Sequence, residues 1–440
     1  MSRSLSLKHH PKELWILALT ELCERYAFWG VGNLLVLFLI EYYQFSNVKA
    51  THIYGLFTGC AAFLPLVGGF LADRWNYQSP MLLGALCNIV GCLMLSSGHP
   101  ALLYPALVVI ALGYGTFTPS ILTVLGFAYR EKPELREAGF SIYYAAINIG
   151  VFLALLSLGS IAKFSSWNTA FFTAACVQAI GLAPLLWYLH KHKETYRALG
   201  KAQEALRHEK KPLAKVDRDR LWVIALFCLF SIVFWIAYNQ AFSSMEIFSH
   251  DFMNRIIGGK EIPEGVFLSS ESLFLVLLAP VLASLYAYLQ KRKKDPSPAT
   301  KTGLSLLFLA ACFAVMVIST WSIPATATHA NVSWSYLVGA YFLMAIGEML
   351  LAPIGLSLVS HLAPQRFTAL LMGFWYVCVG LAFYIGGVLA GLMEKVGGLF
   401  HFFSIFVGLT LIAGIVMLFN AKKITRMAHG KDAGGRPEPL

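Results

Sequence analysis

A short charged motif, the pentapeptide 21–25 of sequence ELCER, lies inside the first apolar segment of the chain, which runs from Leu14 to Ile40. At about 1.5 Å per helical residue, this segment is long enough to cross a bilayer, and the motif lies roughly 10–15 Å from its inner end. Spacings of three and four residues place Glu21, Glu24 and Arg25 on one helical face. A charge at that depth costs at least ~2.5 kcal/mol, so such side chains face other helices or a watery cavity and often carry function.

The residue types in this motif favour two kinds of chemistry. One arginine can neutralise only one of the two glutamates, so the second carboxylate is available to bind a proton. The planar guanidinium of Arg25 can hold a carboxylate group through two parallel hydrogen bonds. The alternative is a structural ion pair that only locks the first helix to a neighbour. We favour the functional interpretation because the charges do not balance.

The composition of the whole chain is typical of a membrane protein. Of 440 residues, 58% are hydrophobic and 13% are charged, which is about half the charged fraction of a soluble protein. The first apolar segment is too long for a secretory signal peptide and has no small-residue cleavage site after it. The eight cysteines form no Cys-x-x-Cys or Cys/His pair, so we expect no disulfide framework, metal site or cofactor. The sequence has no nucleophile–base set and no phosphate-binding loop, and does not predict an enzyme.

Twelve apolar segments are long enough to cross a bilayer as tilted helices. They predict an all-α membrane protein with twelve transmembrane helices. The segments cover roughly residues 14–42, 51–72, 79–98, 101–128, 139–162, 167–190, 220–247, 266–290, 302–322, 335–361, 367–393 and 398–421.

The distribution of positive charge predicts the orientation of these helices. Of the 34 lysines and arginines, 28 lie in the two chain ends and the loops on one side, and five lie in the loops on the other side. The remaining one is Arg25. By the positive-inside rule the first side is cytoplasmic, with both termini there. We therefore expect a multi-pass protein of a cell inner membrane, and the net charge of +11 does not call for a nucleic-acid partner.

A long basic stretch divides the twelve segments into two groups of six. It predicts an N-terminal six-helix bundle at 1–190, a basic cytoplasmic linker at 191–219, a C-terminal six-helix bundle at 220–421 and a cytoplasmic tail at 422–440. We interpret the linker as a solvated connector. This organisation resembles the major facilitator fold, in which the binding site lies near the membrane midplane between the two halves.

Four further motifs lie in or beside the apolar segments. In chain order they are GGFLADRW at 68–75, FSIYYAAINIG at 140–150, FWIAYNQ at 234–240, and GEMLLAPIGLS at 347–357 with LAP at 362–364 and MGFW at 372–375. The glycines in the first of them allow close packing of helices. Asp73 and Arg74 fall at the cytoplasmic rim, where we expect a gating ion pair that opens and closes as the bundles rock.

Together with the charged pentapeptide, these motifs resemble those of the proton-coupled oligopeptide transporter family, a branch of the major facilitators. The resemblance covers both halves, with the five motifs in the family's order. It implies symport of di- and tripeptides with protons, through alternating access of the two halves to a central site.

The resemblance also implies roles for single residues. The proton-coupling set is Glu21, Glu24, Arg25 and Glu348, to which we add Glu271 as an outer acceptor. The substrate-binding set is Arg25, Tyr54, Asn148, Trp235, Gln240, Glu348 and Trp375. In this scheme Arg25 holds the peptide carboxylate and Glu348 the α-amino group. The alternatives are interface anchoring for the two tryptophans and interhelical hydrogen bonding for Asn148 and Gln240.

Three positions depart from the family's pattern. Family members usually carry a lysine where Thr118 stands, an arginine where Gly32 stands and a glutamate where Asn239 stands. Glu271 is an added carboxylate. The alternative to a functional role is that its side chain lies in the water of an outer vestibule. These changes leave the substrate and the proton route open without disturbing the fold.

We therefore expect a proton-coupled symporter that imports di- and tripeptides or peptide-like compounds. Its partners are the small solute, protons and the lipid bilayer, and we expect a monomer. Two alternatives remain. One is a transporter of a different small solute, such as a modified amino acid or an organic anion, and the other is a membrane receptor that does not transport.

Overall fold

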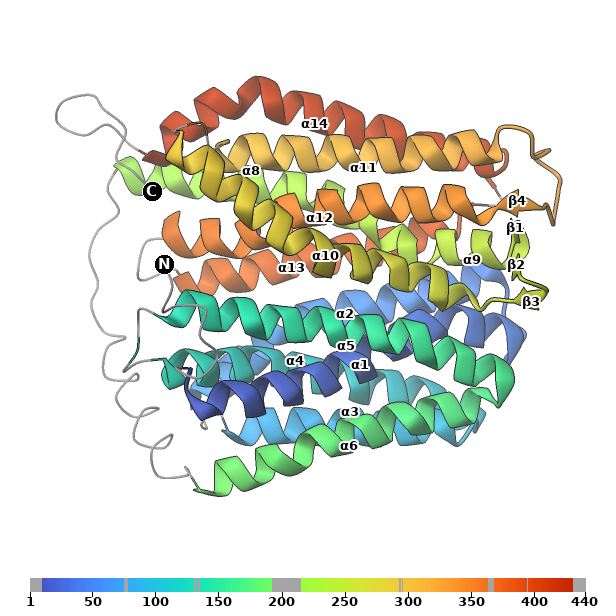
Figure 1. The fold of residues 1–440 in the computed structure, drawn as a ribbon, viewed down its shortest axis with the longest axis horizontal. Helices are drawn as coiled ribbons and strands as arrows, with labels where there is room; N and C mark the ends of the chain where they lie inside the picture. Colours follow the sequence, from blue (N-terminus) through green and yellow to red (C-terminus); the bar gives the residue numbers. More distant parts are fainter. Residues whose placement is uncertain are drawn as a thin grey trace. The chain divides into compact units, whose positions relative to one another are not determined.

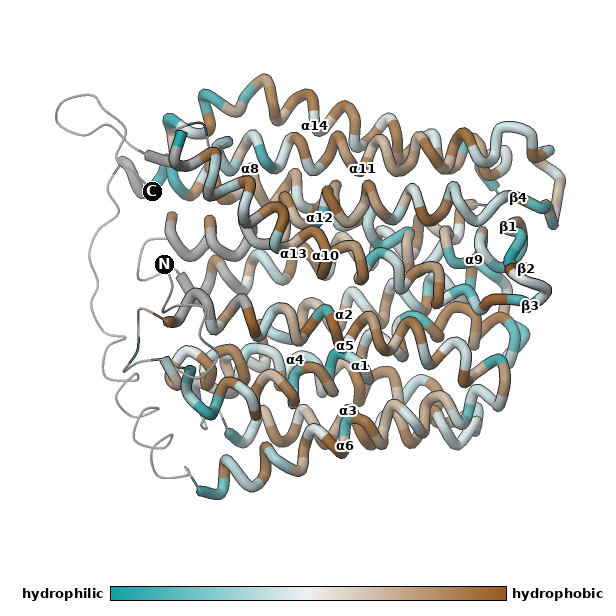
Figure 2. The backbone as a smooth tube through the Cα atoms, in the orientation of Figure 1, coloured by the Kyte–Doolittle hydropathy of each residue, from teal (hydrophilic) through white to brown (hydrophobic). Residues whose placement is uncertain are grey.

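The computed structural model describes residues 10–74, 78–129, 132, 135–191, 215–292, 294, 296–362, 368–393 and 395–429. These residues form α-helices joined by short loops and 3-10 turns, with four strands of two residues each (Figure 1). Twelve of the described helical segments are long and apolar enough to cross a membrane, which confirms the predicted number. Figure 2 shows that the helices are mainly apolar along their length, with polar residues gathered toward their ends.

The chain divides into two compact units, of which the first comprises Met1–Ser46, Cys60–Arg207 and Lys260–Leu273. Its elements are α1 (Lys12–Glu41), the second part of α2 (Asn47–Arg74), α3 (Gln78–Ser96), η2 (Pro100–Leu102), α4 (Leu103–Ala128), α5 (Arg136–Phe164), α6 (Trp167–Lys191), β3 (Lys260–Glu261) and the start of α10 (Glu264–Lys291). Helix α1 packs against α4, α5 and α6, and α3 packs against α4 and α6. The charged pentapeptide of α1 is therefore enclosed by helices within this unit.

The second unit comprises Asn47–Gly59, His208–Gly259 and Phe274–Leu440. Its elements are the first part of α2, α8 (Lys215–Tyr238), η5 (Asn239–Phe242), α9 (Ser244–Asp251), β1 (Met253–Asn254), β2 (Ile256–Ile257), the rest of α10, α11 (Pro298–Thr320), β4 (Val332–Ser333), α12 (Trp334–Leu362), α13 (Thr368–Ala390) and α14 (Leu399–His429). Helix α11 lies beside α14 and α12 (Figure 1), and α8 packs against α12, α13 and α14. Strands β1 and β4 pair in parallel, Met253 with Val332 and Asn254 with Ser333.

The start of α11 shows how local sequence sets a helix end. The side chain of Ser297 accepts a hydrogen bond from the backbone N–H of Thr300 at 3.2 Å, and Pro298 occupies the first helical turn. A serine N-cap followed by proline is a favourable start because proline needs no backbone partner there. The helix consequently begins at Pro298, four residues before the apolar segment that predicted it.

The seventh membrane segment, predicted at 220–247, is a single span from Arg218 to Asp251 that contains a 3-10 turn. Helix α8 ends at Tyr238, the 3-10 turn η5 follows, and α9 begins at Ser244. The hydroxyl of Ser243 donates to the carbonyl of Asn239 at 2.9 Å, and the hydroxyl of Ser244 donates to Oε1 of Gln240 at 2.7 Å.

Gly68 allows α2 and α4 to touch within the first unit. A Cβ atom at this position would overlap the carbonyl of Gly115 on α4. We expect Gly68→Val to lower the midpoint of thermal unfolding by several degrees, because overpacking costs about 1–3 kcal/mol. The matched control is Gly408→Val on α14, where a Cβ meets no atom within 4 Å. Equal melting curves for the two purified variants would contradict this packing.

Candidate functional site

The charged motif of α1 forms a compact ion cluster inside the first unit. Nε of Arg25 lies 2.7 Å from Oε1 of Glu21 and 3.2 Å from Oε2 of Glu24. The side chain of Arg25 is 5% exposed, and those of Glu21 and Glu24 are 1% and 0% exposed. The predicted common face of the three side chains is therefore present, and one guanidinium contacts both carboxylates.

Helix α4 positions the guanidinium of Arg25. Nη2 of Arg25 donates a hydrogen bond to Oγ1 of Thr118 at 2.9 Å. Cζ of Arg25 lies 4.7 Å from the centre of the Tyr114 ring, within the range of a cation–π contact. Thr118 thus supplies a neutral hydrogen-bond acceptor to the cluster.

Two further polar side chains, which the sequence did not single out, complete the cluster. Nδ2 of Asn88 on α3 donates to Oε1 of Glu24 at 3.0 Å. The hydroxyl of Tyr143 on α5 lies close to Glu21. The sequence signal for Asn88 is an asparagine in the middle of the apolar segment 79–98. Tyr143 lies within the motif FSIYYAAINIG at 140–150. Among the described residues that interact with the two carboxylates, Arg25 supplies the only positive charge.

Asn148 lies on α5, which approaches α1 closely. A Cβ at Gly150 would overlap the carbonyl of Leu22, so this glycine lets the two backbones meet beside Glu21. Asn148 is 8% exposed, and its Nδ2 donates to the carbonyl of Tyr144 in its own helix at 2.9 Å. This donation leaves Oδ1 of the amide for another partner, and the substrate role of Asn148 stays a prediction.

In the second unit, Trp235 lies in an aromatic cluster. Its ring is edge-on to Phe234 and Tyr238, each with a centroid separation of 5.2 Å, and to Phe383 at 5.9 Å. Its Nε1 is buried and has no hydrogen-bond partner among the described residues. An indole N–H usually finds a partner when it is buried, so a polar ligand would complete this group.

Tyr54 and Gln240 are both fully buried in the second unit. The Tyr54 hydroxyl lies next to the side chain of Asn239. It does not reach hydrogen-bond geometry with Asn239, and within the described ranges it has no other hydrogen-bond partner. Nε2 of Gln240 donates to the carbonyls of Ile236 and Gly386 at 3.1 and 3.0 Å, so its amide joins α8 to α13.

The other predicted residues of this unit lie on α12 and α13. Glu348 is half-buried and follows Gly347, whose carbonyl accepts a hydrogen bond from Ser305 at 2.7 Å. Trp375 is 4% exposed and packs in an apolar core with Phe227 and Cys378. The substrate roles of Glu348 and Trp375 stay predictions.

Glu271 lies on the part of α10 that belongs to the first unit. It is 2% exposed, and the hydroxyl of Ser272 is 3.4 Å from its Oε2. A position in open water, the alternative raised from the sequence, does not fit this burial. The predicted gating pair, Asp73 and Arg74, lies at the end of α2, and its side chains lie outside the described part of the structure.

Glu246 is a buried acid that the sequence reading passed over. It lies in the first turn of α9 and is 3% exposed. The available signal was an acidic residue inside the predicted segment 220–247, one residue before its end. In the described residues no group of three or more His, Cys, Asp or Glu could hold a metal ion.

Comparison with known proteins places the chain in a family. The sequence profile of the POT family matches residues 79–206 and 185–402. The chain belongs to the POT family. The chain is also 27% identical to Peptide transporter YePEPT from Yersinia enterocolitica, in an alignment that covers 87% of this chain and 88% of that protein.

Solved structures of POT proteins share the fold. A mutant of peptide transporter POT, crystallised with alafosfalin, superposes with a TM-score of 0.83 at 24% identity, covering 96% of this chain and 97% of the other. A POT family transporter in complex with 5-aminolevulinic acid gives a TM-score of 0.83 at 21% identity, with 95% and 98% covered. The predicted family, the twelve-helix major facilitator fold and the assignment to transporters rather than enzymes are confirmed, and the chain is an integral multi-pass membrane protein.

The hydrogen bond from Arg25 to Thr118 gives a testable expectation for this POT protein. Thr118→Val keeps the shape of the side chain but removes the acceptor, which is worth about 1.5–3 kcal/mol for a charged donor. We expect the KM of transport to rise about tenfold or more, while Thr118→Ser stays near wild type because it keeps the hydroxyl. Uptake kinetics of the two variants in proteoliposomes give the KM of each. Indistinguishable KM values would mean that Thr118 does not hold Arg25 during transport.

Proposed function

We propose that this POT protein is a symporter that imports di- and tripeptides or peptide-like compounds together with protons. The observation that carries the proposal is the buried cluster of Arg25 with Glu21 and Glu24, held from α4 by Thr118. A buried charged cluster inside membrane helices is costly, and such clusters in transporters serve substrate and proton pathways.

The proton-coupling role rests on the charge balance of that cluster. Two carboxylates face one guanidinium, and the other described side chains that touch the carboxylates are neutral. A net negative charge in a buried site favours binding of a proton to one carboxylate. We assign this proton to the pair Glu21 and Glu24, with Glu271 and Glu348 as further acceptors along the route.

The substrate role follows from the shape of a zwitterionic peptide. Such a solute carries an anion and a cation at a fixed separation, and its side chains vary. Arg25 is suited to its carboxylate, since a guanidinium offers five donors and only two are engaged by described residues. Glu348 is suited to its ammonium group. We assign the remaining contacts to Tyr54, Asn148, Trp235, Gln240 and Trp375.

The transport cycle in this proposal is alternating access by two six-helix halves. The halves are residues 1–190 and 220–421, joined by the basic linker 191–219 and followed by the tail at 422–440. Positive charge concentrated in the termini and alternate loops favours a cytoplasmic position for both ends, in a cell inner membrane. We assign a monomer as the working unit, and Asp73 with Arg74 as a gating pair.

A second candidate solute is a modified amino acid. Arg25 is the single cation of the described cluster, and it suits the carboxylate of such a solute as well as that of a peptide. The POT family transporter described with 5-aminolevulinic acid binds a compound of this kind, with one carboxylate and one ammonium group.

Uptake into proteoliposomes tests both candidates. The purified protein is reconstituted, an inward proton gradient is imposed, and labelled dialanine and labelled 5-aminolevulinic acid are supplied in parallel. Proton-driven accumulation of dialanine supports peptide symport, and accumulation of 5-aminolevulinic acid alone supports the second candidate. Gradient-independent binding without accumulation of either solute would favour a receptor over a transporter.

A further inference from the structure

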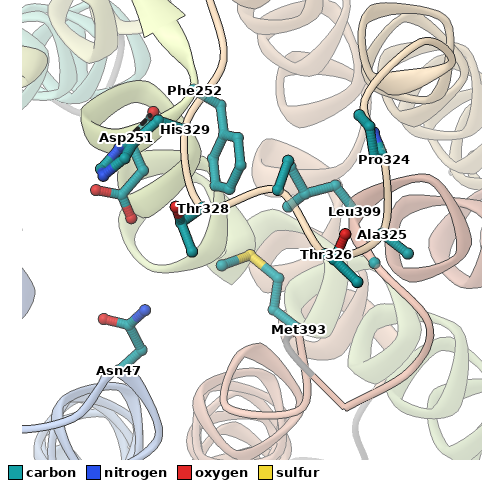
Figure 3. Close-up of a pocket in the computed structure, with 12 residues that line it drawn as sticks. Asn47, Asp251, Phe252, Pro324, Ala325, Thr326, Thr328, His329, Met393 and Leu399 are labelled. Atoms are coloured by element: carbon teal, nitrogen blue, oxygen red, sulfur yellow. Dashed lines mark hydrogen bonds between the residues drawn. The ribbon is translucent and has the colours of Figure 1, made fainter.

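The second unit contains a cavity of about 360 Å³ that is separate from the residues assigned to transport (Figure 3). Four parts of the unit line it: the start of α2, the end of α9, the loop between α11 and β4, and the connection from α13 into α14. Small-molecule sites usually have volumes of roughly 300–1,000 Å³. The cavity is therefore large enough to hold a small organic compound.

The walls of this cavity are held by backbone contacts on two sides. Strand β4 pairs with β1, and the N–H of Val332 donates to the carbonyl of Phe252 at 2.9 Å. The loop between α11 and β4 also lies against the connection into α14, because a Cβ atom at Gly398 would come within 2.9 Å of Cα of Ala325. Gly398 has a φ of +93°, which glycine adopts without steric cost. The shape of the cavity is thus set by the fold of these loops.

One carboxylate supplies negative charge to the cavity. Asp251 is the only acidic side chain among the described lining residues, and these include no lysine or arginine. Its side chain is 24% exposed, and its Oδ1 lies 2.7 Å from Nδ1 of His250, which donates because a carboxylate only accepts. Within the described ranges its Oδ2 makes no hydrogen bond. A carboxylate that is partly withdrawn from water attracts a cation more strongly than one in bulk water does.

A histidine and a threonine bring further acceptors to the same side of the cavity. Nδ1 of His329 lies 3.3 Å from the carbonyl oxygen of Asp251, and it is the donor because a carbonyl only accepts. Nε2 of the neutral ring is then an acceptor. Figure 3 shows Asp251, His329 and Thr328 on one side of the cavity. An ammonium group suits this set, since it has three donors and no acceptor.

The central part of the cavity is apolar. Phe252, Met393 and Leu399 line it, and all three are buried residues. Figure 3 shows their side chains beside the polar groups. An aromatic ring adds to the attraction of a cation that lies within about 6 Å of its face. A carboxylate next to an apolar wall matches a compound that carries an ammonium group on a small hydrocarbon body.

We propose that this cavity is a binding site for a small primary amine, with Asp251 as the counter-charge, His329 and Thr328 as hydrogen-bond acceptors, and Phe252 and Met393 as the wall for its hydrocarbon part. In the predicted topology the loops that line the site face the outside of the cell, so it meets amines of the external medium. The proposal does not rest on the proposed transport function, because none of the residues assigned to transport is among the described lining residues.

Isothermal titration calorimetry of the purified full-length protein tests the site. The titrations are made at about pH 8, where an ordinary histidine is neutral and a primary amine is charged. Benzylammonium is compared with benzyl alcohol, which has the same hydrocarbon part without the charge. We expect benzylammonium to bind the wild type at least tenfold more tightly, because the alcohol lacks the charged hydrogen bond. Equal affinities would indicate partition into detergent or apolar surface and would overturn the proposal.

Two variants and a control locate the bound amine. Asp251→Asn should weaken benzylammonium about tenfold or more and leave benzyl alcohol unchanged. The matched control is Asp219→Asn at the start of α8, which should keep the wild-type affinity. Ala327→Phe fills part of the cavity while Asp251 stays in place, and should weaken both compounds. Wild-type binding of benzylammonium in Asp251→Asn or in Ala327→Phe would overturn the proposal.

A further variant distinguishes this site from the transport site. Glu348→Gln should bind benzylammonium as tightly as the wild type, and loss of binding in this variant would place the amine at the transport site instead. The calorimetric measurement needs no transport. If peptide uptake fails while benzylammonium binding still depends on Asp251, the proposed function is wrong and the amine site stands.

Discussion

Replacement of Arg25 by lysine is expected to reduce uptake at least tenfold, although the positive charge is kept. The guanidinium of Arg25 contacts Glu21 through Nε and Thr118 through Nη2 at the same time, and it lies over the ring of Tyr114. A lysine ammonium is a compact point charge that cannot reproduce this planar arrangement or grip a carboxylate with two parallel bonds. Each lost hydrogen bond to a charged group is worth about 1.5–3 kcal/mol, so even one corresponds to a tenfold effect or more.

The matched control for this change is Arg426→Lys, on the exposed face at the end of α14. It makes the same chemical substitution outside the buried cluster and should leave uptake unchanged. Initial rates and substrate affinity of both variants are measured in the same proteoliposome preparation. Near-normal affinity in Arg25→Lys would assign Arg25 an electrostatic or structural role in place of solute binding.

Glu24→Gln is expected to abolish accumulation of solute against its gradient while leaving exchange of solute across the membrane largely intact. Glu24 is fully buried. Its Oε2 lies 3.2 Å from Nε of Arg25, and its Oε1 accepts a hydrogen bond from Nδ2 of Asn88. Glutamine preserves the size of the side chain and can still accept that hydrogen bond, but it cannot take up and release a proton. Proton-driven uptake should therefore fall much more than counterflow of labelled solute, which needs no net proton movement.

Glu41→Gln provides the control for Glu24→Gln, because it neutralises an exposed acid on the same helix. Both activities of this control should match the wild type. Wild-type accumulation by Glu24→Gln would show that the coupling proton is carried elsewhere. An equal loss of accumulation and counterflow would instead indicate that Glu24 supports the structure of the site.

The central cluster could be predicted from sequence because its geometry is local. Glu21, Glu24 and Arg25 span only about one helical turn, and helical periodicity alone places them on one face. The twelve helices were predictable for a similar reason, since length and apolar composition decide whether a segment spans a bilayer. The partners of the cluster could not be predicted in the same way. Asn88, Thr118 and Tyr143 come from three other helices and meet α1 only through packing.

Hydropathy predicts the seventh membrane segment but not the 3-10 turn inside it. Residues 234–247 are apolar enough to continue a membrane helix, and the seventh span does continue to Asp251. The amide of Gln240 in this turn donates to the carbonyl of Gly386, which lies 146 residues later in the chain, so its partner depends on tertiary packing. The burial of Glu246 depends on the same tertiary arrangement, so an acid near the end of an apolar segment could not be distinguished from a solvated loop residue.

The measurement that tests the central claim most directly is the entry of protons into vesicles during uptake of the solute. Proteoliposomes that contain the wild-type protein and an internal pH-sensitive dye are exposed to dialanine or 5-aminolevulinic acid without an imposed pH gradient. The account predicts that one of these solutes acidifies the vesicle interior, that a protonophore removes the signal, and that Glu24→Gln vesicles show none. Solute uptake in the wild type without any acidification would contradict proton symport through the cluster of Arg25, Glu21 and Glu24.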